Sequence, residues 1–449
     1  MLQIDHVYEF FYRNLFKDFA VHTLPNGVFP IEQIDELKVT DLIVFNITYP
    51  TLKILFIDQE PINEKFIDTY IELFKYPNKD ILYEIENAIL FVNQTPNVEE
   101  LIFSNLEQFN YQKKDIYQLI EHIKNLKISD LFNDIEKNQK HQDRDRDVVF
   151  RDPVAIVTSE KSTLITQLSL NHNLKPLYYF FHGFAALDWY RGFFALNYNK
   201  EVITHYQYDF VTFNRLITND RSYRCYFISL LVEKNLINKG QISFGLNDQN
   251  FRSEITSEDS KLSNNAITHI NQYLPTLQLP LVIDNTDISG CASADIPRCI
   301  DNSLWHIVTE TVFYYNKLHL TEKIFKPIVM KQPFMLLAAP GNLAYLKSYG
   351  FKTFDSIIDE SYDTIVNPDD RIEAVVDQLT WYCNLPTSKK IDVIKAIEPI
   401  VEYNFHWFYN EFKHHITTEL LDNTKSLFNE LNYDDSTIDY TSIYKTLVN

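Results

Sequence analysis

The hydrophobic residues of this chain lie mainly in short continuous runs, such as LIVF at 42–45 and MLLAA at 335–339. An alternating pattern marks a strand with one wet face, whereas a continuous run is typical of a strand buried on both faces. Segments with apolar residues every three to four positions, typical of helices, separate these runs. The pattern predicts an α/β fold built on parallel sheets. The expected strands are 41–48, 53–60, 88–94, 154–160, 176–183, 209–214, 241–245, 279–285, 304–310 and 333–339.

The same pattern suggests how the chain is divided. A chain of 449 residues is expected to form two or three domains. The strands fall into two groups, and the last part of the chain is helical in pattern, with Pro399 as an expected break. We predict two α/β sheet domains, with a ligand cleft between them, followed by C-terminal helices. The expected ranges are 1–205, 206–387 and 388–449.

Composition narrows the classes of protein. The net charge of −20 argues against a protein that coats nucleic acid with a broad basic face, although it allows one local basic groove. Four cysteines in so long a chain predict buried thiols rather than a disulfide framework. Asp5 and Glu9 interrupt the N-terminal stretch, and no apolar run is long enough for a membrane span. We therefore expect a soluble, cytoplasmic protein, in the host-cell cytoplasm if it is viral.

Common nucleotide and hydrolase motifs are absent. The sequence contains no GxxxxGK[ST] loop, no GxGxxG after a strand, no GxSxG and no HExxH. The charged stretch at 134–147 contains a DxD pattern at Asp143, Asp145 and Asp147, which in other settings holds a metal beside a diphosphate. Here arginines alternate with the acids inside a polar run, so a linker or surface loop is favoured and no metal site is predicted.

The stretch HLTEKIFKPIVMKQPFMLLAAPGN at 319–342 combines a charged pair with a buried unit. Thr321 is a plausible N-cap, which places Glu322 and Lys323 in the first turn of a helix. Lys323 could neutralise a phosphate and Glu322 could accept hydrogen bonds from a ribose diol. Pro327 lies past the first turn, so the helix should kink or begin irregularly.

The segment 307–341, IVTETVFYYNKLHLTEKIFKPIVMKQPFMLLAAPG, resembles the donor-binding segment of α1,3-fucosyltransferases, which are GT-B glycosyltransferases. The resemblance covers about 35 residues. It implies a GT-B-like fold of two Rossmann-like parallel-sheet domains that face a cleft, in which 1–205 would bind the acceptor and 206–387 the nucleotide sugar. Thr311 and His319 stand where that family has Asn and Tyr. The donor-binding residues carried over by the resemblance are Glu310, Thr311, His319, Thr321, Glu322 and Lys323.

Three arginines, Arg215, Arg221 and Arg224, cluster around the start of a predicted helix in the second half. In the fucosyltransferases an Arg of the corresponding helix reaches the diphosphate. Arg provides a permanently charged, bidentate clamp for phosphate. By this resemblance Arg221 or Arg224 would hold the donor diphosphate, whereas a solvated basic helix start is the structural alternative.

A catalytic base is expected from the first half, because direct displacement needs a carboxylate or histidine near the acceptor hydroxyl. Asp58 and Glu60 follow one expected strand, and Glu160 follows another. His182 and Asp188 lie in the aromatic stretch YYFFHGFAALDWYRGF. No motif chooses among these candidates.

Together the residues and the resemblance imply a nucleotide-sugar-dependent glycosyltransferase, inverting and metal-independent, with a glycan, a protein or a modified DNA base as acceptor. The stretches 178–193 and 346–363 are also similar to uncharacterised phage-encoded glycosyltransferase-like proteins. One alternative is therefore a phage enzyme that transfers glucose or arabinose to hydroxymethylcytosine in DNA. The other is a non-catalytic virion or scaffold protein that keeps the fold.

Overall fold

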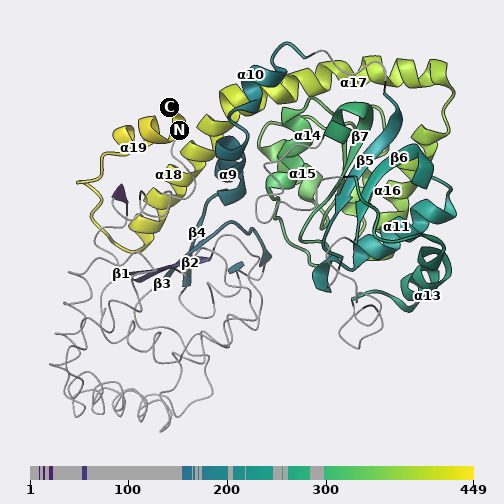
Figure 1. Cartoon of the computed structure of the whole chain (residues 1–449). Helices are drawn as coiled ribbons and strands as arrows, with labels where there is room; N and C mark the ends of the chain where they lie inside the picture. The colour runs from purple at the N-terminus through teal and green to yellow at the C-terminus, as the bar shows by residue number, and fades with distance from the viewer. Residues whose placement is uncertain are drawn as a thin grey trace, which may run out of the picture.

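The described part of the protein contains two four-stranded sheets and the helices that pack against them (Figure 1). The computed structural model describes residues 154–449 except for 164, 167–169, 171–173, 201–205, 218, 246–254, 256–260 and 284–297. Near the N-terminus it describes positions 10, 14, 15, 20–23 and 53–57.

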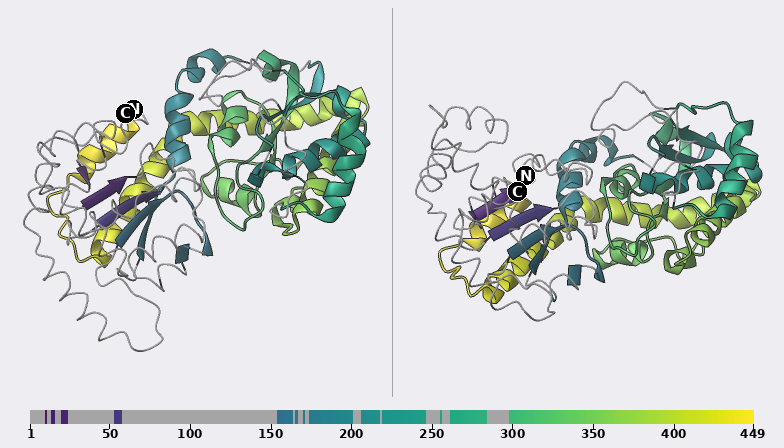
Figure 2. Two further views of the ribbon diagram at one scale, coloured as in Figure 1. Left: turned by 60° about the horizontal axis from the view of Figure 1, so that its bottom comes forward. Right: turned by 90° about the horizontal axis from the view of Figure 1, so that it is seen from below.

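The first sheet has four parallel strands that follow chain order, β1-β2-β3-β4. Val154 lies opposite Lys53 on one side and Leu174 on the other, which fixes the register of β3 between its neighbours. Figure 2 shows the strands side by side with the C-terminal helices next to them. The strands are β1 (Ala20–Thr23), β2 (Lys53–Ile57), β3 (Val154–Thr158) and β4 (Leu174–Tyr178).

The second sheet is also parallel, but its order is β6-β5-β7-β8. After β5 the chain builds β6 on one side and then crosses to build β7 on the other, so the strand order reverses between β5 and β7. Open α/β sheets bind ligands beyond the carboxyl ends of the strands at such a reversal. The strands are β5 (Tyr208–Asn214), β6 (Gly240–Phe244), β7 (Ser303–Thr309) and β8 (Phe334–Leu337).

Helices cover these sheets and connect them. The α-helices are α9 (Phe181–Trp189), α10 (Phe193–Asn197), α11 (Tyr223–Glu233), α13 (Asn264–Tyr273), α14 (Phe325–Val329), α15 (Asn342–Ser348), α16 (Pro368–Cys383), α17 (Thr387–Trp407), α18 (Lys413–Glu430) and α19 (Tyr440–Val448). Short 3-10 segments are Asn219–Arg221, Ile237–Lys239, Leu274–Thr276, Arg298–Asn302, Glu322–Ile324 and Ser361–Thr364.

The C-terminal helices link the two sheets. α17, a π-helical turn at Phe408–Phe412 and α18 follow one another without a gap. α17 packs against α14 beside the second sheet, and α18 packs against β4 and α9 of the first part (Figure 1). The expected break at Pro399 is wrong, because α17 runs through it. Ile397 and Val401 are buried on either side, so tertiary packing outweighs the local cost of the proline.

Most described strands match the predicted runs, with two corrections. The run 176–183 is a strand only as far as Tyr178, and the chain turns into α9 at Phe181. In 279–285 the described residues, 279–283, contain only a single bridge from Leu281 to Phe244. The runs 41–48 and 88–94, the end of 53–60, and the charged stretch 134–147 lie outside the described residues.

The parallel α/β architecture is thus confirmed for the described residues. The domain boundaries and the two-domain GT-B arrangement stay predictions. Within the described part of the chain, no helix combines the length and apolar character needed to cross a bilayer.

Candidate functional site

The predicted helix start at Thr321 is present. Thr321 is extended, and its hydroxyl accepts a hydrogen bond from the Lys323 backbone N–H at 3.4 Å. The helix begins irregularly, as Pro327 predicts, with a 3-10 turn at Glu322–Ile324 that continues as the five-residue α14. Pro327 is the third residue of α14 and the sixth of the continuous helical segment, and the helix runs through it to Val329. The turn therefore places the charged pair at the start of a short helix.

Glu310, the first residue after β7, holds this turn through hydrogen bonds to its carboxylate. Its carboxylate is fully buried and accepts hydrogen bonds from the Thr321 backbone N–H at 3.1 Å, the Thr321 hydroxyl at 2.5 Å and the Thr311 backbone N–H at 3.2 Å. Hydrogen bonds to an ionised group are stronger than neutral ones. Glu310 therefore fixes the loop in position, and it lies beside the point where the strand order of the sheet reverses.

Lys323 is the cation of the site. Its ammonium group donates to the hydroxyls of Thr311 and Thr321, at 3.2 and 3.1 Å, and pairs with the Glu322 carboxylate at 3.1 Å. The Lys323 side chain is 35% exposed, so part of it faces the solvent.

Glu322 connects this cation to the first part of the molecule. Its second carboxylate oxygen lies 3.4 Å from Nδ1 of His182, which belongs to the first turn of α9. That distance is at the long end for a hydrogen bond. Burial alone would raise the pKa of Glu322, but Lys323 and His182 outweigh it and hold the pKa below its usual value. Glu322 is therefore ionised at neutral pH.

Two buried histidine rings face each other here. His182 and His319 are packed edge to face with ring centroids 5.3 Å apart, and they are 7% and 1% exposed. No ring nitrogen of either residue has a hydrogen bond within the described residues, apart from the long contact of His182. Burial, together with the nearby His182, Lys323 and Lys317, holds the pKa of His319 well below its usual value, so this ring is neutral at physiological pH.

Residues from two other segments anchor the loop that carries His319. The Asn342 side chain, at the start of α15, accepts a hydrogen bond from His319 N and donates to Lys317 O, both at 3.0 Å. Lys317 Nζ pairs with the buried Glu160 carboxylate at 3.2 Å. The backbones of Lys161 and Leu318 exchange two hydrogen bonds. The chain after β3 is therefore joined directly to the loop that carries His319.

The predicted arginines occupy different positions. The Arg224 guanidinium is buried and donates to the backbone carbonyls of Leu216, Thr309 and Glu310, at 2.8, 2.8 and 3.4 Å. It therefore holds the ends of β5 and β7 together. Arg221 lies in the 3-10 turn just before α11 and is partly exposed. Its predicted contact with a diphosphate remains a prediction.

Among the candidate bases, His182 is the one that lies in the cluster. Asp188 is at the other end of α9 and pairs with Arg191 at 2.5 Å. Glu160 is paired with Lys317. Asp58 and Glu60 lie outside the described residues.

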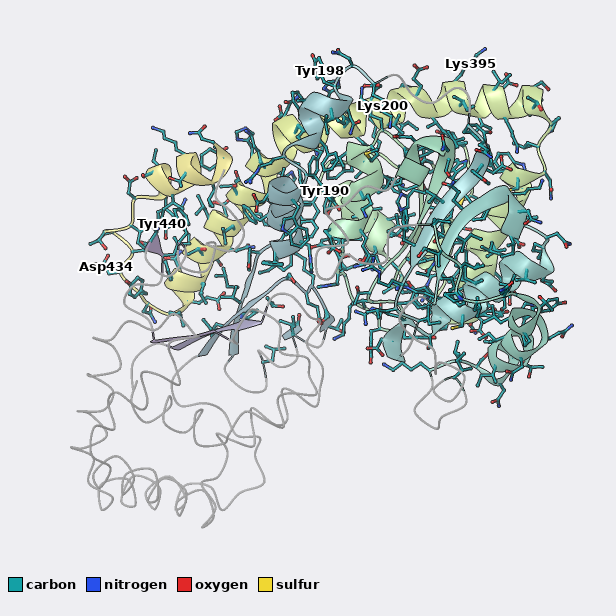
Figure 3. The ribbon with its side chains drawn as sticks, viewed as in Figure 1. Tyr190, Tyr198, Lys200, Lys395, Asp434 and Tyr440 are labelled. Atoms are coloured by element: carbon teal, nitrogen blue, oxygen red, sulfur yellow. The ribbon has the colours of Figure 1, made fainter. Side chains whose placement is uncertain are left out.

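An aromatic residue at the end of α9, Tyr190, also contacts the turn that carries Glu322. Tyr190, between the two sheets in Figure 3, directs its hydroxyl to the Glu322 backbone carbonyl at 3.5 Å. Burial, followed by the charge of Glu322, raises the pKa of Tyr190 well above its usual value, so it remains a neutral donor.

The resulting site combines a partly exposed lysine side chain, an ionised carboxylate and two buried imidazole rings at the carboxyl ends of parallel strands. Such groups can bind an anionic leaving group, hydrogen-bond a sugar hydroxyl and accept a proton. Within the described residues, no group of three His, Cys, Asp or Glu side chains is arranged to hold a metal ion. Sequence reasoning missed Lys317 and Asn342; the Pro-Gly-Asn turn was the available signal for Asn342.

Comparisons with known proteins add little. No protein-family model matches the chain, and no curated protein matches it. One solved structure, a glycosyltransferase from Rickettsia africae ESF-5, is similar over 93% of this chain and 99% of its own, at 10% sequence identity and a TM-score of 0.32. A likeness this weak supports no argument about the fold or the activity of this protein.

Proposed function

We propose that this protein is a glycosyltransferase that moves a sugar from a nucleotide-sugar donor to an acceptor hydroxyl. The observation that carries the proposal is the cluster of Thr321, Glu322 and Lys323 on Glu310, at the strand reversal of a parallel sheet. The residue types match those of the donor-binding segment that the sequence resembles. Their position is where such sheets bind nucleotides.

Lys323 neutralises the leaving diphosphate in this proposal. Its ammonium group is held by oxygen atoms of Thr311, Thr321 and Glu322, and its side chain is partly exposed, so the charge is pre-positioned at low cost in side-chain entropy. A fixed positive charge at the point where negative charge develops stabilises the transition state. Arg221 is the second candidate contact to the phosphates.

In this proposal Glu322 contacts the ribose of the nucleotide sugar, and His182 contacts the acceptor hydroxyl. A carboxylate can accept about four hydrogen bonds, so Glu322 can hold Lys323 and His182 and still accept one from a ribose hydroxyl. A histidine oriented by a carboxylate is a common general base. The acceptor oxygen bonds to the anomeric carbon, the bond from that carbon to the diphosphate oxygen breaks, and the hydroxyl proton passes to His182.

The experiment that tests this proposal is a thermal-shift titration with UDP, GDP, CMP and their sugar conjugates. A ligand that binds the folded state raises the melting temperature as its concentration exceeds the dissociation constant. We expect one nucleotide series to stabilise the wild type, and Lys323→Met to weaken its binding by about ten- to a hundredfold, the size of one lost charged hydrogen bond.

Lys395→Met is the matched control. Lys395 lies on the exposed side of α17, far along the helix from the site (Figure 3). It should bind the nucleotide as the wild type does. If no nucleotide or nucleotide sugar shifts the melting temperature, or if Lys323→Met binds as well as Lys395→Met, the proposal fails. A catalytically inactive scaffold protein would then be the better interpretation.

A further inference from the structure

A cavity of about 250 Å³ lies at the carboxyl ends of β3 and β4, next to the loop that runs from Lys317 to Thr321. Thr158, at the end of β3, and Tyr178, at the end of β4, line one side. α18 lines the other with Asn423, Ser426, Leu427 and Glu430, which recur at helical spacing on one face. The volume is below that of pockets for drug-sized ligands, so the cavity suits a small ligand.

Each charged residue that lines the cavity has an opposite charge beside it. Glu160 pairs with Lys317 at 3.2 Å. Lys161 pairs with Glu419 at 2.7 Å. Glu430 lies 3.6 Å from Lys175 Nζ. The wall is thus neutral in sum, and a charged ligand would have to give up its hydration without finding an uncompensated partner.

The remaining lining is a mixture of hydroxyl groups and apolar surface. Thr158, Ser162, Thr166 and Ser426 contribute hydroxyls, and Asn423 contributes an amide that is fixed by donation to Tyr178 O at 2.9 Å. Apolar surface comes from Ile165, Pro176, Leu427 and the Tyr178 ring. Neutral saccharides combine hydroxyl groups with apolar C–H faces, so their chemistry matches this wall.

Two residues that line the cavity also contact the loop from Lys317 to Thr321. Glu160 and Lys161 line it, and the same two residues hold Lys317 and Leu318 on the loop that leads to His319 and Thr321. A ligand in the cavity is therefore next to the loop that positions Glu322 and Lys323.

We infer that this cavity is a binding site for a small, neutral, polyhydroxylated molecule, a saccharide, and that α18 forms half of it. Its role as the acceptor site rests on the proposed glycosyl transfer. The binding itself does not. The neutral wall disfavours a DNA acceptor, whose phosphates require unpaired basic groups.

Binding is tested by saturation-transfer NMR on the full chain with methyl glycosides of glucose, galactose, mannose and N-acetylglucosamine. Ser426→Tyr places a ring at the mouth of the cavity, and Asn429→Tyr places the same ring at an exposed position of α18 that does not line it. We expect at least one glycoside to bind the wild type. Ser426→Tyr should weaken that binding by at least about tenfold, whereas Asn429→Tyr should stay within about twofold.

Charged probes complete the experiment. A hexuronate and a short duplex containing hydroxymethylcytosine are titrated in the same way, and neither should bind in a manner sensitive to Ser426→Tyr. The inference is overturned if none of the glycosides binds, if their binding survives Ser426→Tyr while both variants fold, or if a charged probe binds this site more tightly.

The nucleotide titration separates this inference from the proposed function. Ser426→Tyr should leave the nucleotide-induced thermal shift unchanged. If nucleotides fail to bind but a glycoside binds and is displaced by Ser426→Tyr, glycosyl transfer is wrong and the saccharide site stands. If nucleotides bind but glycosides do not, the saccharide site is wrong and the proposed nucleotide-sugar site stands.

Discussion

Two buried glutamates, each just beyond a parallel strand of one of the two sheets, differ in the partners that their carboxylates bind. Glu310 follows β7 and Glu160 lies two residues past β3, and they are 0% and 1% exposed. Glu310 accepts hydrogen bonds from neutral groups of its own part of the chain, at Thr311 and Thr321. Glu160 instead pairs with a cation, Lys317, which arrives from the loop after β7.

The difference shows that the partner, and not the residue type or its position after a strand, decides the role. A carboxylate held by local N–H and O–H donors shapes a turn and presents the groups on it, here Glu322 and Lys323. A carboxylate paired with a distant ammonium group joins two segments of the chain. The two glutamates therefore contact opposite ends of the same loop, which runs from Lys317 to Thr321.

The largest effect is expected from removal of the local anchor. Glu310→Ala leaves the buried N–H groups of Thr311 and Thr321 without their acceptor, and each unsatisfied group costs about 1 to 3 kcal/mol. We expect the free energy of unfolding in urea to fall by about 4 kcal/mol. Glu398→Ala, at an exposed position of α17, is the control and should stay within about 0.5 kcal/mol.

The conservative variant Glu310→Gln keeps one acceptor oxygen and should lose less stability than Glu310→Ala. Equal losses in the two variants would mean that the hydrogen bonds to the carboxylate are not what holds the turn.

The stability that Glu160 contributes should depend on its ion pair with Lys317. Lys317→Met leaves the Glu160 charge buried without its cation, which typically costs about 3 kcal/mol. The double variant Lys317→Met/Glu160→Gln removes both charges and should recover most of that loss. A double-mutant cycle in urea measures the recovery. Losses that simply add would show that the two residues are not coupled, and the contrast with Glu310 would disappear.

Acid should weaken the second sheet and the shared loop through buried neutral histidines. Burial, and then the Lys326 charge, lowers the pKa of His306 to about 3. Between pH 6.5 and 3 the unfolded chain binds this proton and the folded chain does not, so stability falls as pH falls, by about 1.4 kcal/mol per unit. The depressed pKa of His319 acts in the same direction.

Urea unfolding at pH 7.5 and 5.5 checks this prediction. The wild type should lose at least about 1.4 kcal/mol over that interval through His306. His306→Asn should show a smaller loss relative to its own value at pH 7.5. His406→Gln, on the exposed side of α17, should keep the wild-type slope. An unchanged slope in His306→Asn would contradict the assignment.

The second sheet was largely predictable because its central strand β7 is buried on both faces. Every residue of β7 is buried, so the strand reads as a continuous apolar run. The end of β4 was not predictable by this rule. Residues Phe181–Asp188 of α9 are buried on all sides, and a helix without a polar face lacks the period that distinguishes it from a strand.

For the site, the sequence predicted local features and missed distant ones. The Thr321 cap and the pair that follows it depend on adjacent residues, and the structure has the cap. Lys317 and Asn342 act through Glu160 and the His319 backbone, contacts that no local pattern encodes. His182 was one candidate base among several, because only the tertiary fold brings α9 to Glu322.

The smallest effect is expected at the pair next to Glu160. Lys161 pairs with Glu419 at 2.7 Å and lies 4.0 Å from the centre of the Tyr178 ring, but its side chain is 37% exposed. Water screens an exposed pair, so Lys161→Met should cost about 1 kcal/mol or less, and less still at high salt. Its backbone bonds to Leu318 are retained in the variant. A loss as large as that of Lys317→Met would show that exposure does not separate these two lysines, and that the charge of Lys161 also holds the chain after β3 to α18.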